Sequence, residues 1–235
     1  MSHPEQKFLS SFGRNRGRSL RPYQQGLVDN LLPQLQCHPE RSEGSGSLSE
    51  ILRCAQDDSY RRIALEIGFG GGEHLLAQAR HNPDTLWIGC EPFINGVAKC
   101  LAGIDKEKLT NIRLYTNDAR KLIEQIPDAS IDSIFILFPD PWPKLRHNKR
   151  RLVNGQTLAM LARIHKPGGR LLIATDHADY SVWMFEHLLA SPHYRWTAER
   201  MDDWHIPPRD WTETKYQRKT TAEGRAPVFM ECVRN

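Results

Sequence analysis

The sequence lacks the features that anchor a chain in a membrane or send it across one. Among its 235 residues, no apolar run approaches the ~18 residues of a membrane-spanning helix, and the densest stretch is only Ile134 to Phe138. The first 22 residues contain no apolar signal core. We therefore expect no membrane contact and, by default, a cytoplasmic location.

Metal and disulfide chemistry have equally little support. The five cysteines are scattered and lack Cys-x-x-Cys spacing, and the ten histidines show no ligand spacing with Cys, Asp or Glu. We expect reduced, mostly buried thiols and no metal site. The cysteines are Cys37, Cys54, Cys90, Cys100 and Cys232.

The sequence does contain an alternation of two hydrophobic patterns. From Tyr60 onward, short apolar runs alternate with helix-period segments, and 39% of all residues are hydrophobic, which is enough for one sizeable core. This pattern predicts a doubly wound α/β domain. We expect strands near 63–67, 85–90, 112–116, 131–138, 170–175, 193–199 and 227–233, and helices near 73–81, 93–103, 118–126, 154–165 and 178–190.

Composition divides the chain into three regions. We expect residues 1–36 to form a basic N-terminal arm and residues 60–235 to form the α/β domain. Between them, residues 37–59 show no periodicity and are rich in serine, glycine and glutamate, so they bury too little apolar surface to offset the entropy of ordering. This segment resembles translated palindromic repeat elements. We expect a flexible insert whose deletion leaves activity intact.

Positive charge is unevenly distributed, although the net charge is only +4. Five basic residues and no acidic one lie between Gln6 and Val28, and five basic residues occupy the eight positions from Lys144 to Arg151. An enzyme with a polyanion-binding edge has this distribution, and so does a solvated surface. Charge alone leaves both interpretations open.

A glycine-rich turn joins a predicted strand to a predicted helix between Ala64 and Glu73. Glycine permits positive φ and a close approach of the backbone to a ligand. Gly68, Gly70 and Gly72 follow G-x-G-x-G rather than the dinucleotide spacing, and Glu73 would repel a pyrophosphate at the helix N-terminus. We therefore predict S-adenosylmethionine, a nucleoside cofactor without phosphates. A tight turn without a ligand is the simpler alternative.

Acidic and amide side chains end successive predicted strands. Glu91 follows the first glycine of the turn by 23 residues, close to the ~20 expected for an acid that binds a ribose. Asn117, Asp118 and Ala119 end the third strand, where they can reach an adenine. Together with Glu66 these acids suit a sulfonium cation. Each could instead cap a helix, Asp118 above all.

The fourth predicted strand runs into a proline-rich loop from Phe138 to Lys144. Its three prolines stiffen a loop at the carboxyl end of a central strand, where open α/β sheets bind ligands, so we expect Asp140 to be held at the site. Trp142 offers a flat face for a base, although packing is the commoner role. The residues that we expect to contact an RNA backbone are Arg146, Lys149, Arg150 and Arg151.

Six motifs follow one another along the chain: LEIGFGGG, GCEP, NDARKL, FPDPWPKLRHNKRRLV, ATDHADY and TKYQ. In this order they resemble the bacterial tRNA (guanine-N7-)-methyltransferase family over about 60 to 235, and the basic arm around Phe12 to Leu32 resembles it more loosely. The resemblance implies a Rossmann-like class I methyltransferase fold, with a seven-stranded, mostly parallel sheet and an antiparallel C-terminal strand. It also implies methyl transfer from S-adenosylmethionine to N7 of a guanine in tRNA, at position 46 of the variable loop, by a monomer or homodimer with no obligatory protein partner.

The resemblance further implies roles for individual residues. It marks Asp140 as catalytic, and Glu66, Glu91, Asp118 and Asp140 as cofactor contacts. The implied substrate contacts are Lys144, Asp176, Thr214, Lys215, Tyr216 and Gln217. The family usually has Glu where this chain has Gln217, so a neutral amide replaces a carboxylate. Guanine N7 has a free lone pair and needs no general base, so alignment and electrostatics must supply the rate.

Two other functions remain open from the residues themselves. A nicotinamide oxidoreductase is disfavoured by Glu73. The intact Asp140 loop argues against a non-catalytic RNA-binding module, whereas Gln217 and the insert argue modestly for it. The polar region from Trp204 to Gly224 is expected to be a loop that closes over substrate, or else a long surface connection, before the last strand.

Overall fold

The computed structural model describes residues 17–37 and 60–235. Most of the predicted insert, 38–59, and the first sixteen residues of the arm therefore lie outside the described residues. The described helices and strands are, in chain order, α1 (Pro22–Asn30), α2 (Leu32–Leu35), β1 (Arg62–Ile67), α4 (Glu73–His81), β2 (Thr85–Cys90), α5 (Ile94–Glu107), β3 (Ile112–Tyr115), α6 (Ala119–Gln125), β4 (Ile131–Leu137), the 3-10 helix η2 (Leu145–Arg150), α7 (Gly155–Ile164), β5 (His165–Thr175), α8 (Ala178–Leu189), β6 (Tyr194–Trp196), α9 (Asp202–His205), α10 (Lys215–Ala222) and β7 (Val228–Arg234).

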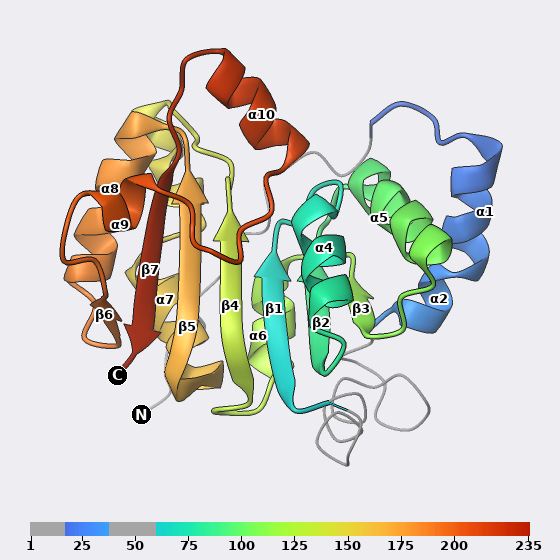
Figure 1. Ribbon diagram of the computed structural model, residues 1–235, viewed down its shortest axis with the longest axis horizontal. Helices are drawn as coiled ribbons and strands as arrows, with labels where there is room; N and C mark the ends of the chain where they lie inside the picture. Colours follow the sequence, from blue (N-terminus) through green and yellow to red (C-terminus); the bar gives the residue numbers. More distant parts are fainter. Residues whose placement is uncertain (1–16, 38–59) are drawn as a thin grey trace.

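The strands form one seven-stranded sheet in the order β3-β2-β1-β4-β5-β7-β6 (Figure 1). Strands β1 to β5 pair in parallel, and β7 runs antiparallel to both β5 and β6. This confirms the predicted fold class, including the antiparallel C-terminal strand. Strand order reverses at β1, whose neighbours are β2 and β4, and open α/β sheets bind ligands at such a point.

Helices cover both faces of the sheet because alternate strand residues are apolar on each face. In β1, Ile63 and Leu65 pack in one core cluster with α6, α7 and α8. Ala64 belongs to the second cluster, on the face covered by α2, α4 and α5. In the part of the chain that the structure describes, no helix has both the length and the apolarity to cross a membrane.

The described part of the N-terminal arm packs against α5 and the β3 edge (Figure 1). Its last residue, Cys37, is 1% exposed and donates its backbone N–H to the carbonyl of Leu114 at 2.8 Å. Burial raises the pKa of this thiol to about 12. Cys37 therefore belongs to the core rather than to the insert. That deletion of the insert leaves activity intact stays a prediction, best tested from residue 38 onward.

The region predicted to be one loop before the last strand contains two helices, α9 and α10. Helix α10 was not predicted because its buried residues, Gln217 and Thr220, are polar and give no apolar stripe. A capping signal was nevertheless present, since Thr214 accepts a hydrogen bond from the backbone N–H of Gln217. Figure 1 shows α10 at the top of the picture, above the arrowhead of β4, at the carboxyl edge of the sheet.

Candidate active site

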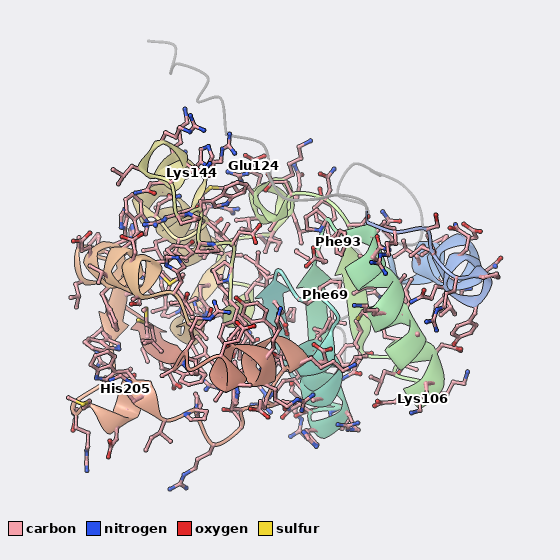
Figure 2. All side chains as sticks on the ribbon, turned by 90° about the horizontal axis from the view of Figure 1, so that it is seen from above. Phe69, Phe93, Lys106, Glu124, Lys144 and His205 are labelled. Atoms are coloured by element: carbon pink, nitrogen blue, oxygen red, sulfur yellow. The ribbon has the colours of Figure 1, made fainter. Side chains whose placement is uncertain are left out.

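A cleft of about 560 Å³ opens at the carboxyl ends of β1, β2 and β4, and its volume lies within the ~300–1,000 Å³ usual for small-molecule sites. Seen from above, Lys144, which follows β4, is well separated from Phe69 and Phe93, which follow β1 and β2 (Figure 2). The predicted residues that line this cleft are Glu66, Gly68, Gly70, Glu91, Asn117, Asp118, Ala119, Asp140, Arg150, Thr214 and Tyr216.

The glycine turn after β1 presents bare backbone to the cleft. Gly68 and Gly70 have φ of 79° and 55°, and a Cβ on either would meet no atom within 4 Å. Gly72 does not line the cleft. A Cβ there would lie 2.7 Å from the Sγ of Cys100, so Gly72 serves the packing of α4 on α5. Its predicted cofactor contact is corrected accordingly.

Glu91 links the end of β2 to the glycine turn. Its Oε2 accepts the N–H of Gly70 at 2.8 Å, and its Oε1 accepts the N–H of Phe93 at 2.9 Å. Each oxygen keeps a lone pair for a further donor, such as a ribose hydroxyl. Burial raises the pKa of Glu91 despite these two bonds, and the nearby charges of Asp140 and Glu66 raise it further. A cation in the cleft would stabilise the ionised form.

Glu66 is held by a residue that the sequence analysis did not identify. Its Oε2 lies 2.8 Å from Nδ1 of His74 in the first turn of α4, and both side chains are only 2% exposed. The His74 ring lies 5.1 Å from the ring of Phe135 and 5.5 Å from that of Trp211, which precedes α10. His74 therefore connects an acid of the cleft to the C-terminal segment, a connection with no signal in the local sequence.

Asp118 combines two of the roles considered from the sequence. It caps α6 by accepting the backbone N–H of Arg120 at 3.0 Å, and it also accepts the Nε of Arg120 at 2.9 Å. It lines the cleft as well. The cap and the ion pair fix the carboxylate in place at the wall of the cleft.

The lining residues fit S-adenosylmethionine. Five carboxylates and two arginines line the cleft, so acidic groups outnumber cationic side chains, as a sulfonium requires. The open backbone at Gly68 and Gly70 gives room for the close approach of a nucleoside. The acids are Glu66, Glu73, Glu91, Asp118 and Asp140.

Asp140 lies on an exposed, strained loop at the rim of the cleft. On either side of it, Phe138 and Trp142 have positive φ, 51° and 44°, although neither is glycine. Such conformations cost of order 1–3 kcal/mol each and persist only where the surroundings enforce them. The loop is held by a bond from the N–H of Phe138 to the carbonyl of Ala174 at 2.8 Å, and by Arg150, which lies 5.0 Å from the centre of the Trp142 ring.

Comparison with known proteins identifies the family. A protein-family model described as "Putative methyltransferase" matches residues 60–230. Relatives named tRNA (guanine-N(7)-)-methyltransferase from Nitrobacter hamburgensis and Caulobacter sp. strain K31 are each 45% identical to the chain. The first alignment covers 94% of this chain and 85% of the relative, and the second covers 100% of both. The chain belongs to the tRNA (guanine-N(7)-)-methyltransferase family.

Solved structures of other methyltransferases share the fold. The antibiotic-resistance methyltransferase Kmr has a TM-score of 0.56 and 18% identity, covering 84% of this chain and 97% of its own. The 16S rRNA (adenine(1408)-N(1))-methyltransferase from Catenulisporales acidiphilia has a TM-score of 0.54 and 19% identity, covering 82% and 95%. At such identities the likeness shows the class I methyltransferase fold alone.

On the substrate side of this tRNA (guanine-N(7)-)-methyltransferase family member, α10 covers the end of β5. The Tyr216 hydroxyl lies 3.3 Å from Oδ1 of Asp176, and Nη1 of Arg225 lies 2.8 Å from its Oδ2. The Asp176 side chain is consequently only 4% exposed. Lys144 and Lys215 are exposed, and neither they nor Asp176 line the cleft, so their contacts with substrate stay predictions.

Gln217 does not face the cleft in this methyltransferase. It is 6% exposed, and its Oε1 accepts the indole N–H of Trp211 at 2.7 Å. Its backbone N–H also bonds the Thr214 hydroxyl, as the N-terminal cap of α10. The predicted guanine contact is corrected, because the amide holds the C-terminal segment together instead.

The basic run after the Asp140 loop separates into exposed and buried members. Arg146 and Lys149 are exposed and Arg150 lines the cleft, as phosphate or substrate contacts require. Arg151 is 2% exposed, and its Nη2 pairs with Asp179. A phosphate cannot reach a guanidinium in this position, so the prediction that Arg151 contacts an RNA backbone is corrected.

Proposed function

We propose that this chain transfers the methyl group of S-adenosylmethionine to N7 of a guanine in tRNA, at position 46 of the variable loop, in the cytoplasm. The observation that carries the proposal is the placement of Asp140 at the rim of a cleft that also contains Glu66 and Glu91. The printed activity of relatives that match the whole chain at 45% identity supports it.

The cofactor is held by the three strand ends. Glu91 accepts hydrogen bonds from the ribose hydroxyls. The adenine is contacted by Asn117, Asp118 and Ala119. The backbone of the glycine turn lies against the amino-acid portion of the cofactor. Bound there, the sulfonium supplies an electrophilic methyl group. The proposal includes no obligatory protein partner, and the chain is proposed to act as a monomer or a homodimer.

The chain contributes alignment and charge rather than proton transfer. Guanine N7 carries a lone pair and no proton, so the rate depends on holding it in line with the methyl group. Positive charge moves to the purine during transfer, and the carboxylate of Asp140 at the rim stabilises it there. Asp176 accepts N–H groups of the guanine, and Tyr216, which is 46% exposed and lines the cleft, offers a ring for the base.

The tRNA is held around the cleft by exposed cations. A base stacked inside folded tRNA must first be exposed, at a cost of about a few kcal/mol. Contacts with phosphates offset this cost, and the exposed side chains of η2 and its flanks supply them. The proposed phosphate contacts are Arg146, Lys149 and Arg150, and Lys144 and Lys215 are proposed as substrate contacts.

The test is incubation of the purified chain with unmodified tRNA and S-adenosylmethionine that carries a radiolabelled methyl group. We expect label in tRNA as N7-methylguanosine, mapped to the variable loop, and none with Asp140→Ala. Absence of label from tRNA, or label on another atom of the base, overturns the proposal.

A further inference from the structure

Arg151 is buried where a charged side chain is rarely found. It follows η2 directly, is 2% exposed, and is one of the largest side chains in the described core. Arginine is almost never fully buried unless its charge and its N–H groups are paired. Its partners therefore indicate what the buried charge is for.

These partners belong to α8 and to the loop that carries Asp140. The Nε of Arg151 donates to the carbonyl of Pro141 at 2.9 Å. Its guanidinium carbon lies 5.0 Å from the centre of the Tyr180 ring and 5.1 Å from that of Trp183, and its Nη2 pairs with Asp179. Three of the four contacts are with α8, and the fourth is with the residue directly after Asp140.

The loop that carries Asp140 has few backbone N–H groups with which to hold its own conformation. Pro139, Pro141 and Pro143 have no N–H, so these three positions donate no backbone hydrogen bond. Phe138 and Trp142 hold positive φ, a conformation that other groups must enforce. The bond from Arg151 fixes the carbonyl between Asp140 and Trp142 against the rigid surface of α8.

We propose that Arg151 is a positioning residue, which sets the position of the Asp140 carboxylate at the rim of the cleft by fixing the Pro141 carbonyl to α8. This inference rests on the proposed function, in which Asp140 acts on the reacting guanine. The planar group of arginine makes these contacts together, and lysine cannot. Lysine has no Nε–H to donate from the side of its chain while its end meets Asp179, and it does not stack flat on two rings.

The test compares Arg151→Ala and Arg151→Lys with wild type, with Asp179→Asn as a matched control. The control removes a carboxylate that is 65% exposed but leaves the contact with Pro141 in place. We expect kcat to fall about 10²-fold in both Arg151 variants, the loss that a misplacement of about 1 Å brings. The Kd for S-adenosylmethionine and the KM for tRNA should stay within about threefold, and Asp179→Asn should keep kcat within about twofold.

Chemical rescue separates positioning from general stability. Methylguanidinium at millimolar concentration should restore part of the kcat of Arg151→Ala, because it fits the space left beside Pro141, Tyr180 and Trp183. It should not restore Asp140→Ala. A merely structural role predicts a lowered Tm and weaker cofactor binding together with the lower kcat, and no rescue.

The inference is overturned if both Arg151 variants keep kcat within about twofold of wild type, or if both lose cofactor binding and folding without rescue. If Arg151→Ala alone fails to fold, the kcat of Arg151→Lys decides between the two outcomes, because this variant retains the buried charge beside Asp179. An inactive Asp140→Ala beside a fully active Arg151→Lys refutes the inference alone. A wild-type chain that does not methylate tRNA refutes the proposed function first.

Discussion

Arg225 and Asp176 form an ion pair beside the cleft, with 2.8 Å between Nη1 and Oδ2. The Tyr216 hydroxyl lies 3.3 Å from the other carboxylate oxygen. The carboxylate that we propose for binding guanine is thus held by two donors of the C-terminal segment. A guanidinium and the N–H edge of guanine both offer adjacent donors to a carboxylate, so the two compete for Asp176.

Replacing Arg225 by alanine should therefore strengthen tRNA binding. We expect the KM for tRNA to fall by up to about fivefold, the equivalent of the ~1 kcal/mol that a typical hydrogen-bonded pair contributes, with kcat unchanged. Arg225→Lys keeps the charge and should change KM less. Steady-state kinetics with unmodified tRNA measure both. A higher KM in Arg225→Ala would show that Arg225 helps to bind the substrate.

Asp140→Ala should abolish turnover without unfolding the protein. Loss of one group that stabilises the transition-state charge costs about 10²-fold to 10³-fold in kcat. Asp140 is exposed, so the free energy of unfolding should change by no more than about 0.5 kcal/mol. Single-turnover methylation and thermal unfolding measure the two effects. A variant within a few-fold of wild type would remove Asp140 from the chemistry.

His74→Phe should lower both stability and cofactor affinity. The ring volume stays similar, but the buried Glu66 loses its partner, which costs about 1–3 kcal/mol or more if the carboxylate is charged. His74→Gln retains a donor and serves as the control. Urea unfolding and calorimetric titration with S-adenosylmethionine give the two quantities. Equal behaviour of the two variants would argue that the bond to Glu66 is unimportant.

Neutralising Arg146 and Lys149 should weaken tRNA binding by reducing only the electrostatic, salt-dependent part of the binding free energy. Each lost phosphate contact reduces the slope of log K against log salt by about 0.7–0.9. Lys106→Gln is the control, because Lys106 lies on α5 far from Lys144 (Figure 2). Filter binding at several salt concentrations gives the slopes, and cofactor affinity should not change. An unaltered slope in Arg146→Gln/Lys149→Gln would place the RNA elsewhere.

tRNA binding should strengthen as the pH falls, through His147. Desolvation lowers the pKa of His147, and the cations Arg150, Arg146, Lys144 and Lys149 lower it further. A phosphate beside the ring raises the pKa again, so binding takes up a proton. The gain in affinity is complete below the lowered pKa of the free protein and is lost as the pH rises through the pKa in the complex. His147→Gln should flatten the dependence of the tRNA Kd on pH between 5.5 and 8.

Apolar periodicity made most of the fold predictable. The spacing of apolar residues placed α4 at its observed bounds and located all seven strands, because both faces of the sheet need apolar side chains. Apolar spacing does not predict helix α10, because this helix buries Gln217 and Thr220 rather than an apolar stripe. Its capping sequence was the one local signal available.

The role of a side chain cannot be predicted from the local sequence when it depends on a partner far along the chain. In the sequence Arg151 is one of several basic residues in a row, and nothing distinguishes it from the others. Only the placement of α8 makes it a buried partner of Pro141. Gly72 reads like the other glycines of its turn, and its partner Cys100 comes from the next helix. These contacts join residues that are far apart in the sequence, so local motifs do not reveal them.

The antiparallel placement of β7 between β5 and β6 has a mechanical consequence for α10. This helix belongs to a bridge between two strands of the same sheet, not to a free tail, and both of its ends are anchored. The attachment to β6 and β7 holds both ends of the segment 197–227 at the sheet, and α10 can move only as far as these attachments allow. Any movement that widens the cleft must therefore leave both ends of this segment in place, so it is a shift of the bridge and not the release of a tail.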